Sequence, residues 1–169
     1  MSLKNMQRTG LWKAAFEDQS ANPAIHYHPP VPFRPRPGSY REFMFSHVML
    51  GTNDLEVSKK FYDAVLGTLG IGPGVANKNR YFYRSPTGSF AISTPINGAP
   101  ATHGNGSTIG FAAASAAQVD AFHAAGVANG GTTCEDPPGF REGGAVKLYL
   151  AYLRDPDGNK IRASHRPAK

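Results

Sequence analysis

The feature that most constrains this sequence is a weak internal repeat, in which residues 47–50 lie over residues 108–111 at an offset of 61 positions. At the same offset Phe61 meets Phe122, and the order strand, helix, three strands recurs with matching turn residues. Similarity at a fixed offset is typical of chains built from copies of one supersecondary unit. The 169 residues therefore predict an internal duplication, with two small units that share one core.

The first unit is predicted over about residues 45–98. Residues 45–51 are mainly apolar and predict a strand, and Asp54 follows at the position of a helix N-cap. Apolar residues then recur at helical spacing until the glycines near residues 67–70. Three strands are expected after this helix, around residues 74–76, 81–84 and 90–94, with the turn SPTG at 85–88 between the last two.

The second unit is predicted over about residues 105–167. Ser115 takes the capping position before a helix expected at 116–128. The turn DPDG at 155–158 lies over the turn SPTG of the first unit. Between these elements, residues 136–144 form a long glycine-containing segment, for which we consider a lid over a cleft and a plain surface loop.

Residues 1–44 differ in kind from the rest, because six of the fourteen prolines fall between positions 23 and 37. Proline lacks a backbone donor and keeps the preceding residue out of the helical region, so an extended polyproline-like segment is expected. The apolar residues of this extension favour an arm that lies over a neighbouring subunit, and a disordered tail is the alternative.

Charge and composition exclude several classes of protein. The formal net charge of +6 divides evenly between residues 1–44 and 45–169, and no three basic residues are consecutive, so we expect no nucleic-acid partner. No stretch approaches the ~20 apolar residues of a membrane span, and no secretory leader is recognisable. The single cysteine, Cys134, excludes an intramolecular disulfide and any multi-cysteine metal site. We therefore expect a cytoplasmic protein with no membrane partner.

Short motifs are spread over nearly all of residues 45–165. They are HVMLG at 47–51, DL at 54–55, FYDAVLG at 61–67, VDAFH at 119–123, GG at 130–131 and DPDGNKI at 155–161. Together these motifs resemble the vicinal oxygen chelate superfamily of glyoxalases, bleomycin resistance proteins and dioxygenases, with this chain as a divergent glyoxalase-like member. The resemblance implies an α+β fold of two βαβββ modules, whose curled mixed sheets surround a cleft that holds substrate and usually a divalent metal.

Side chains alternate across a strand, so the predicted strands divide into residues that face the helix and residues that face the cleft. If Val48 and Leu50 face the helix, the intervening side chains face the cleft. The same rule gives one cleft-facing candidate on each terminal strand of the two units, and these are His47, Ser93, Thr108 and Arg162.

In the metal-binding members, the resemblance implies an imidazole or a carboxylate at these four positions. A site for zinc, nickel, iron or manganese needs about three nitrogen, carboxylate or thiolate ligands, and this set supplies one imidazole. Arg162 also puts a permanent positive charge where the cation would lie. We therefore expect no metal cofactor. The alternative is a divalent metal bound by His47 and by ligands that the sequence does not reveal.

The predicted function is the binding of a small organic anion in the cleft, without a catalytic metal. Arg162 can hold a carboxylate or a phosphate by two parallel hydrogen bonds, and His47 can exchange a proton near neutral pH. The further candidate ligand-binding residues are Ser93, Thr108 and Tyr149, with Tyr152 as an alternative wall. The sequence assigns no reaction, although His47 is the candidate catalytic residue. The alternative function is a metal-dependent lyase, isomerase or dioxygenase that uses His47, and in either case we expect a homodimer.

Overall fold

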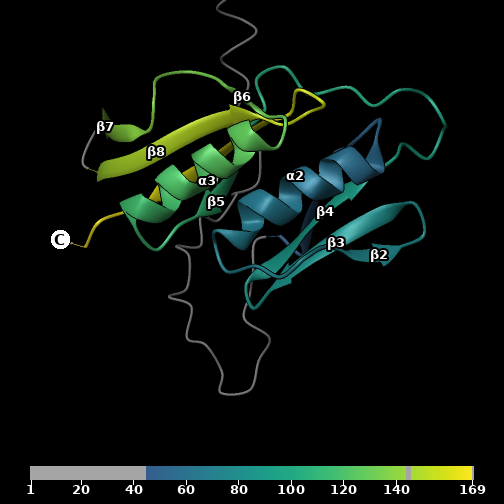
Figure 1. Cartoon of the computed structure of the whole chain (residues 1–169), viewed down its shortest axis with the longest axis horizontal. Helices are drawn as coiled ribbons and strands as arrows, with labels where there is room; N and C mark the ends of the chain where they lie inside the picture. The colour runs from purple at the N-terminus through teal and green to yellow at the C-terminus, as the bar shows by residue number, and fades with distance from the viewer. Residues whose placement is uncertain (1–44, 144–145, 169) are drawn as a thin grey trace, which may run out of the picture. The chain divides into compact units, whose positions relative to one another are not determined.

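The computed structural model describes residues 45–143 and 146–168 (Figure 1). The predictions for residues 1–44, the proline-rich arm and its short helix, lie outside these residues. No helix in the described part of the chain is long and apolar enough to cross a membrane.

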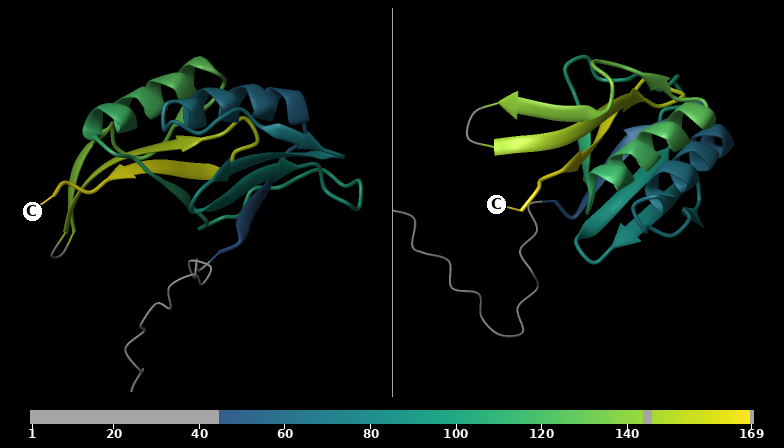
Figure 2. Two further views of the ribbon diagram at one scale, coloured as in Figure 1. Left: turned by 90° about the horizontal axis from the view of Figure 1, so that it is seen from below. Right: turned by 60° about the vertical axis from the view of Figure 1, so that its left-hand side comes forward.

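The first half forms a four-stranded sheet with the strand order β1-β4-β3-β2. Its first strand runs parallel to its last, and the other pairs are antiparallel. Helix α2 packs on one face of this sheet (Figures 1 and 2). The elements are β1 (His47–Gly51), α2 (Leu55–Gly67), β2 (Val75–Asn77), β3 (Arg80–Ser85) and β4 (Gly88–Ser93).

The second half forms a five-stranded sheet in which β5-β9-β8-β6 is the main order and β7 also pairs with β8. Again the first strand lies parallel to the last, which confirms the predicted α+β fold with two mixed sheets. The elements are β5 (Ile109–Ala112), α3 (Ala116–Ala128), β6 (Thr132–Thr133), β7 (Gly139–Gly143), β8 (Val146–Arg154) and β9 (Lys160–His165).

Both helices begin at the predicted caps. The carboxylate of Asp54 accepts hydrogen bonds from the backbone N–H groups of Glu56 and Val57 at 3.1 and 3.0 Å. The hydroxyl of Ser115 accepts one from the N–H of Gln118 at 3.2 Å. These bonds satisfy donors that the first turn of a helix leaves unpaired, and they explain why the two boundaries were readable from the sequence.

Within the segment 136–144, the structure differs from the loop that the sequence predicts. Gly139–Gly143 is the strand β7, paired antiparallel with β8, so the prediction of a lid or a surface loop is wrong for these residues. The ring of Phe140 packs edge-on against Tyr149, with centroids 5.0 Å apart. This cross-strand contact and the backbone pairing hold β7 in the sheet.

The core lies between the two helices and the faces of the sheets that they cover. Both helices lie on the same side of the sheets and contact each other (Figure 2). A chain of aromatic rings joins the halves, because Phe90 of β4 packs edge-on against Phe111 of β5 at 5.3 Å. The helix α3 approaches β8 closely at Gly126, where an added Cβ atom would lie 2.3 Å from Leu153.

The β8–β9 turn fastens the second half to the start of α2. Asp157 accepts hydrogen bonds from the backbone N–H of Asn53 at 2.8 Å and from the hydroxyl of Ser58 at 2.9 Å. Burial alone would raise the pKa of Asp157, but the hydrogen bonds from Thr52, Asn53 and Ser58 outweigh it and lower the pKa. The carboxylate is therefore held in its charged form at the junction.

Asp155 anchors the same turn from within the core, where it is 4% exposed. Its carboxylate accepts hydrogen bonds from the hydroxyl of Tyr62 at 2.7 Å and from the side-chain amide of Asn159 at 2.9 Å. Asn159 in turn donates to the backbone carbonyl of Gly51 at 3.2 Å. The DPDGN segment is thus a structural joint between the two halves.

Candidate functional site

Each sheet has one face covered by a helix and one face without a helix, which we call the open face (Figure 2). Ile161 and Ala163 of β9 are fully buried in the core, so Arg162 between them projects from the open face of the second sheet. Leu50 of β1 packs against the core, and the alternation places His47 on the open face of the first sheet.

Arg162 lies between the two strands that flank β9. On one side its register partner is Gly110 of β5, and an added Cβ atom there would lie 3.0 Å from the Nε atom of Arg162. On the other side, its Nη1 atom donates a hydrogen bond to the hydroxyl of Tyr152 at 3.3 Å. The missing side chain at Gly110 therefore leaves room for the guanidinium to lie along the sheet.

The charge of Arg162 has no carboxylate partner among the side chains that the structure describes, those of residues 45–141 and 146–168. Lys160, two residues before Arg162 on β9, does have a carboxylate partner, Glu135. The ammonium group of Lys160 also lies 4.8 Å from the ring centroid of Tyr152. Arg162 is half-buried, so this positive charge lies where solvent screening is reduced.

The structure does not bring His47 and Ser93 together. His47 is opposite Ser89 in the parallel pair of β1 and β4, whereas Ser93 is opposite Gly51. Four residues of strand separate the two positions, which is about 13 Å at ~3.3 Å per residue. His47 is exposed, with its Nδ1 atom 3.1 Å from the hydroxyl oxygen of Ser46.

Ser93 is buried and its hydroxyl is used inside the fold. Its oxygen lies 2.9 Å from the carbonyl oxygen of Thr94 and 3.3 Å from that of Asn79, and it can donate to either of them. This pairing fixes the loop before β3 against the end of β4. The hydroxyl predicted to contact a ligand is thus engaged with backbone carbonyls.

Thr108 and Tyr149 also lie apart from Arg162. Thr108 is exposed and precedes β5, two residues before Gly110. Tyr149 lies on the helix-covered side, where its hydroxyl donates to Asp120 of α3 at 2.9 Å. That hydrogen bond, with a smaller effect of burial, raises the pKa of Tyr149. The tyrosine beside Arg162 is Tyr152, the alternative considered from the sequence.

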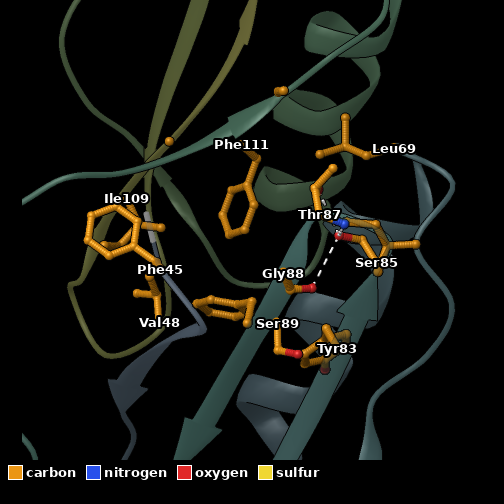
Figure 3. A pocket seen from close by; sticks show the side chains of 14 residues that line it. Phe45, Val48, Leu69, Tyr83, Ser85, Thr87, Gly88, Ser89, Ile109 and Phe111 are labelled. Carbon is orange, nitrogen blue, oxygen red and sulfur yellow. Dashed lines mark hydrogen bonds between the residues drawn. The ribbon is translucent and has the colours of Figure 1, made fainter. Parts of the chain in front are cut away.

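The structure contains a cavity that the sequence did not predict. A cavity of about 510 Å³ lies on the helix-covered side of β1 and β4, bounded by the turn between β3 and β4 and by β5 (Figure 3). Its lining is mostly apolar and includes Val48, Phe90 and Phe111. Alternation predicts that Val48 faces the helix, but a strand pattern does not reveal where facing elements leave a space.

Both the sequence and the fold of this chain match one known superfamily. The sequence profile of the Glyoxalase/Bleomycin resistance protein/Dioxygenase superfamily matches residues 44–163, and the chain belongs to this superfamily. It is 82% identical to a glyoxalase/bleomycin resistance protein from Albidiferax ferrireducens T118, whose crystal structure superposes with a TM-score of 0.72 over 73% of this chain and 99% of that chain.

More distant structures share the fold alone. A putative glyoxalase from Bacillus halodurans is 23% identical, with a TM-score of 0.59 over 72% of this chain and 95% of that chain. A glyoxalase-related enzyme from Fulvimarina pelagi is 21% identical, with a TM-score of 0.57 over 73% of this chain and 88% of that chain. No curated protein sequence matches this chain.

The residues present do not fit the divalent metal that this superfamily usually holds. In the described part of the chain, no three His, Cys, Asp or Glu side chains gather closely enough to ligate a metal ion. At the four candidate positions the donors are one imidazole, two hydroxyls and a guanidinium, and the strand register separates the imidazole from the hydroxyl of Ser93. Such a set lacks the ligands of a zinc, nickel, iron or manganese centre.

Proposed function

We propose that this protein binds a small organic anion on the open face of the second sheet, with Arg162 as the anchoring cation and without a metal. The observation that carries the proposal is the half-buried guanidinium of Arg162, which has no carboxylate partner among the described side chains of residues 45–141 and 146–168. Arginine presents five N–H donors in a planar fork that matches a carboxylate or a phosphate.

The surroundings of Arg162 support an organic anion rather than a bare ion. One N–H group donates to Tyr152, which leaves the other donors of the fork available to a ligand. The ring of Tyr152, opposite Arg162 in the pairing of β8 with β9, offers a potential apolar contact beside the guanidinium. A ligand with a carboxylate next to a flat apolar body therefore matches this face best.

The proposal is tested by titrating the protein with benzoate and with benzamide, its neutral isostere. Benzoate is expected to bind about tenfold or more tightly than benzamide, because only the carboxylate forms charge-assisted hydrogen bonds with Arg162. Prior dialysis against a chelator is expected to leave both affinities unchanged. Equal affinities would contradict the anion site, and a loss of benzoate binding after chelation would show that a metal holds the ligand.

We also propose that the protein is a homodimer and that residues 1–44 act as an arm over the neighbouring subunit. The proposal rests on the apolar residues of this proline-rich segment. Deletion of residues 1–43 is expected to convert a dimer into a monomer, as measured by the mass in solution from light scattering. A dimer that persists after the deletion would contradict a role for the arm in assembly.

A further inference from the structure

We infer that the cavity bounded by Phe111 is a second binding site, which takes an uncharged, mainly aromatic molecule with one hydrogen-bonding group. The inference does not rest on the anion site, because the cavity lies on the helix-covered side of β1 and β4 whereas Arg162 projects from the open face of the second sheet. The two come near each other at Gly110, which lines the cavity and is the register partner of Arg162. At about 510 Å³, the cavity has the size of many small-molecule sites. Three observations support this occupant: the apolar wall, the absence of charge and the hydroxyl groups at one end.

The wall of the cavity is apolar and rich in aromatic rings. Phe90 and Phe111 meet edge-on at 5.3 Å, and Phe45 at the rim is 62% exposed to solvent. The other apolar lining residues are Val48, Leu69, Ile71, Ile109 and Ala112. A flat aromatic ligand would bury this apolar surface away from water. Its ring could pack edge-to-face or stacked against the phenylalanine rings.

No Asp, Glu, Lys, Arg or His lines the cavity among the described residues. Tyr83 is the one ionisable lining residue, and its hydroxyl donates to Asp63 at 3.0 Å. Burial, followed by the charge of Asp63, raises the pKa of Tyr83 far above its usual range, so this residue stays neutral. A charged ligand would lose its hydration here without gaining a counter-ion, so the site selects an uncharged one.

Hydroxyl groups lie at one end of the cavity, opposite Phe45 and Ile109 (Figure 3). The hydroxyl oxygens of Ser85 and Thr87 are 3.1 Å apart, and Ser85 donates to the carbonyl of Gly88 at 3.2 Å. Because Ser85 gives its proton to Gly88, Thr87 is the donor in the bond between the two hydroxyls, and the Thr87 oxygen can still accept a hydrogen bond from a ligand. A phenol O–H or an amide N–H on the ligand would be oriented by this end.

The β8–β9 turn of the second half carries different side chains from the β3–β4 turn of the first half. There, Asp155 and Asp157 fill the contact beneath the β8–β9 turn with hydrogen bonds to the first half. The β3–β4 turn carries Ser85 and Thr87 where those carboxylates would lie in the repeat, and it leaves a cavity instead. The solvent-exposed Phe45 at the rim shows that a ligand can reach this space from outside.

The test uses N-phenyl-1-naphthylamine, an uncharged aromatic probe whose fluorescence rises in apolar sites. The full-length protein is expected to bind it saturably, and the Val48→Phe variant, which fills the cavity, is expected to bind it at least about tenfold more weakly. Val57→Phe is the matched control, because Val57 is exposed on α2 and does not line the cavity. It is expected to bind the probe as the parent protein does.

A second variant covers the case in which Val48→Phe fails to fold, as judged by circular dichroism. Thr87→Val removes a hydroxyl from an exposed turn and is expected to weaken binding of 1-naphthol, a neutral probe that bears a hydroxyl, by about three- to tenfold. The inference is overturned if the parent protein binds neither probe. It is equally overturned if the two phenylalanine variants bind N-phenyl-1-naphthylamine alike, or if Thr87→Val leaves 1-naphthol binding unchanged.

Discussion

Replacement of Asp155 by alanine is expected to lower the free energy of unfolding by about 3–5 kcal/mol, because a buried hydrogen-bonding centre is lost. One carboxylate oxygen accepts from Tyr62 and from the amide of Asn159, and the other accepts from the backbone N–H groups of Asp157 and Asn159 at 3.0 and 2.8 Å. Alanine would leave these donors in the core without an acceptor. The joint between the two halves would loosen at the same time.

Denaturation by urea, followed by circular dichroism, measures this loss. Tyr62→Phe is the graded control, because it removes one hydroxyl and keeps the ring in the core. It is expected to cost about 1 kcal/mol, the usual net value of one hydrogen bond. An Asp155→Ala variant within about 1 kcal/mol of the parent protein would show that the DPDGN turn does not hold the halves together.

Replacement of Arg162 by glutamine is expected to weaken benzoate binding by about 10- to 100-fold. The substitution keeps a planar polar side chain and removes the positive charge, so the carboxylate loses its charge-assisted pair of hydrogen bonds. Charge-assisted bonds of this kind contribute about 1.5–3 kcal/mol, which corresponds to that range of affinity. Isothermal titration calorimetry of the two proteins gives the comparison directly.

Lys60→Gln is the matched control for this experiment. Lys60 is exposed on α2, away from the open face, and the substitution lowers the net charge by the same amount. Benzoate affinity is expected to be unchanged in this variant at physiological salt, because screening removes the influence of distant surface charges. Equal weakening in both variants would mean that overall charge, and not the Arg162 site, attracts the anion.

The local parts of this fold could be predicted from the sequence because their causes are local. Asp54 and Ser115 are good caps next to apolar residues at helical spacing, and both helices begin where these residues predict. Alternation predicts that Arg162 faces away from the helix, and the burial of its neighbours Ile161 and Ala163 in the core agrees with this prediction. The class of fold was implied by the resemblance of the short motifs to the superfamily.

The arrangement of the candidate site depends on contacts between distant segments, which alternation does not determine. The parallel register of β1 and β4 separates His47 from Ser93, because alternation gives the face that a residue takes and not its distance from a residue on another strand. Tyr149 and Tyr152 lie three positions apart on one strand, so only one of them can accompany Arg162. The register of β8 against β9 selects Tyr152, and this pairing is visible only in the folded chain.

The most direct test of an anion site at Arg162 is a crystal structure of the protein soaked with 4-bromobenzoate, with data collected at the bromine absorption edge. We expect an anomalous peak on the open face of the second sheet, with the carboxylate within hydrogen-bonding distance of Arg162 and near Tyr152. A bromine site elsewhere, with only water beside Arg162, would contradict the account. So would a metal ion bound beside His47.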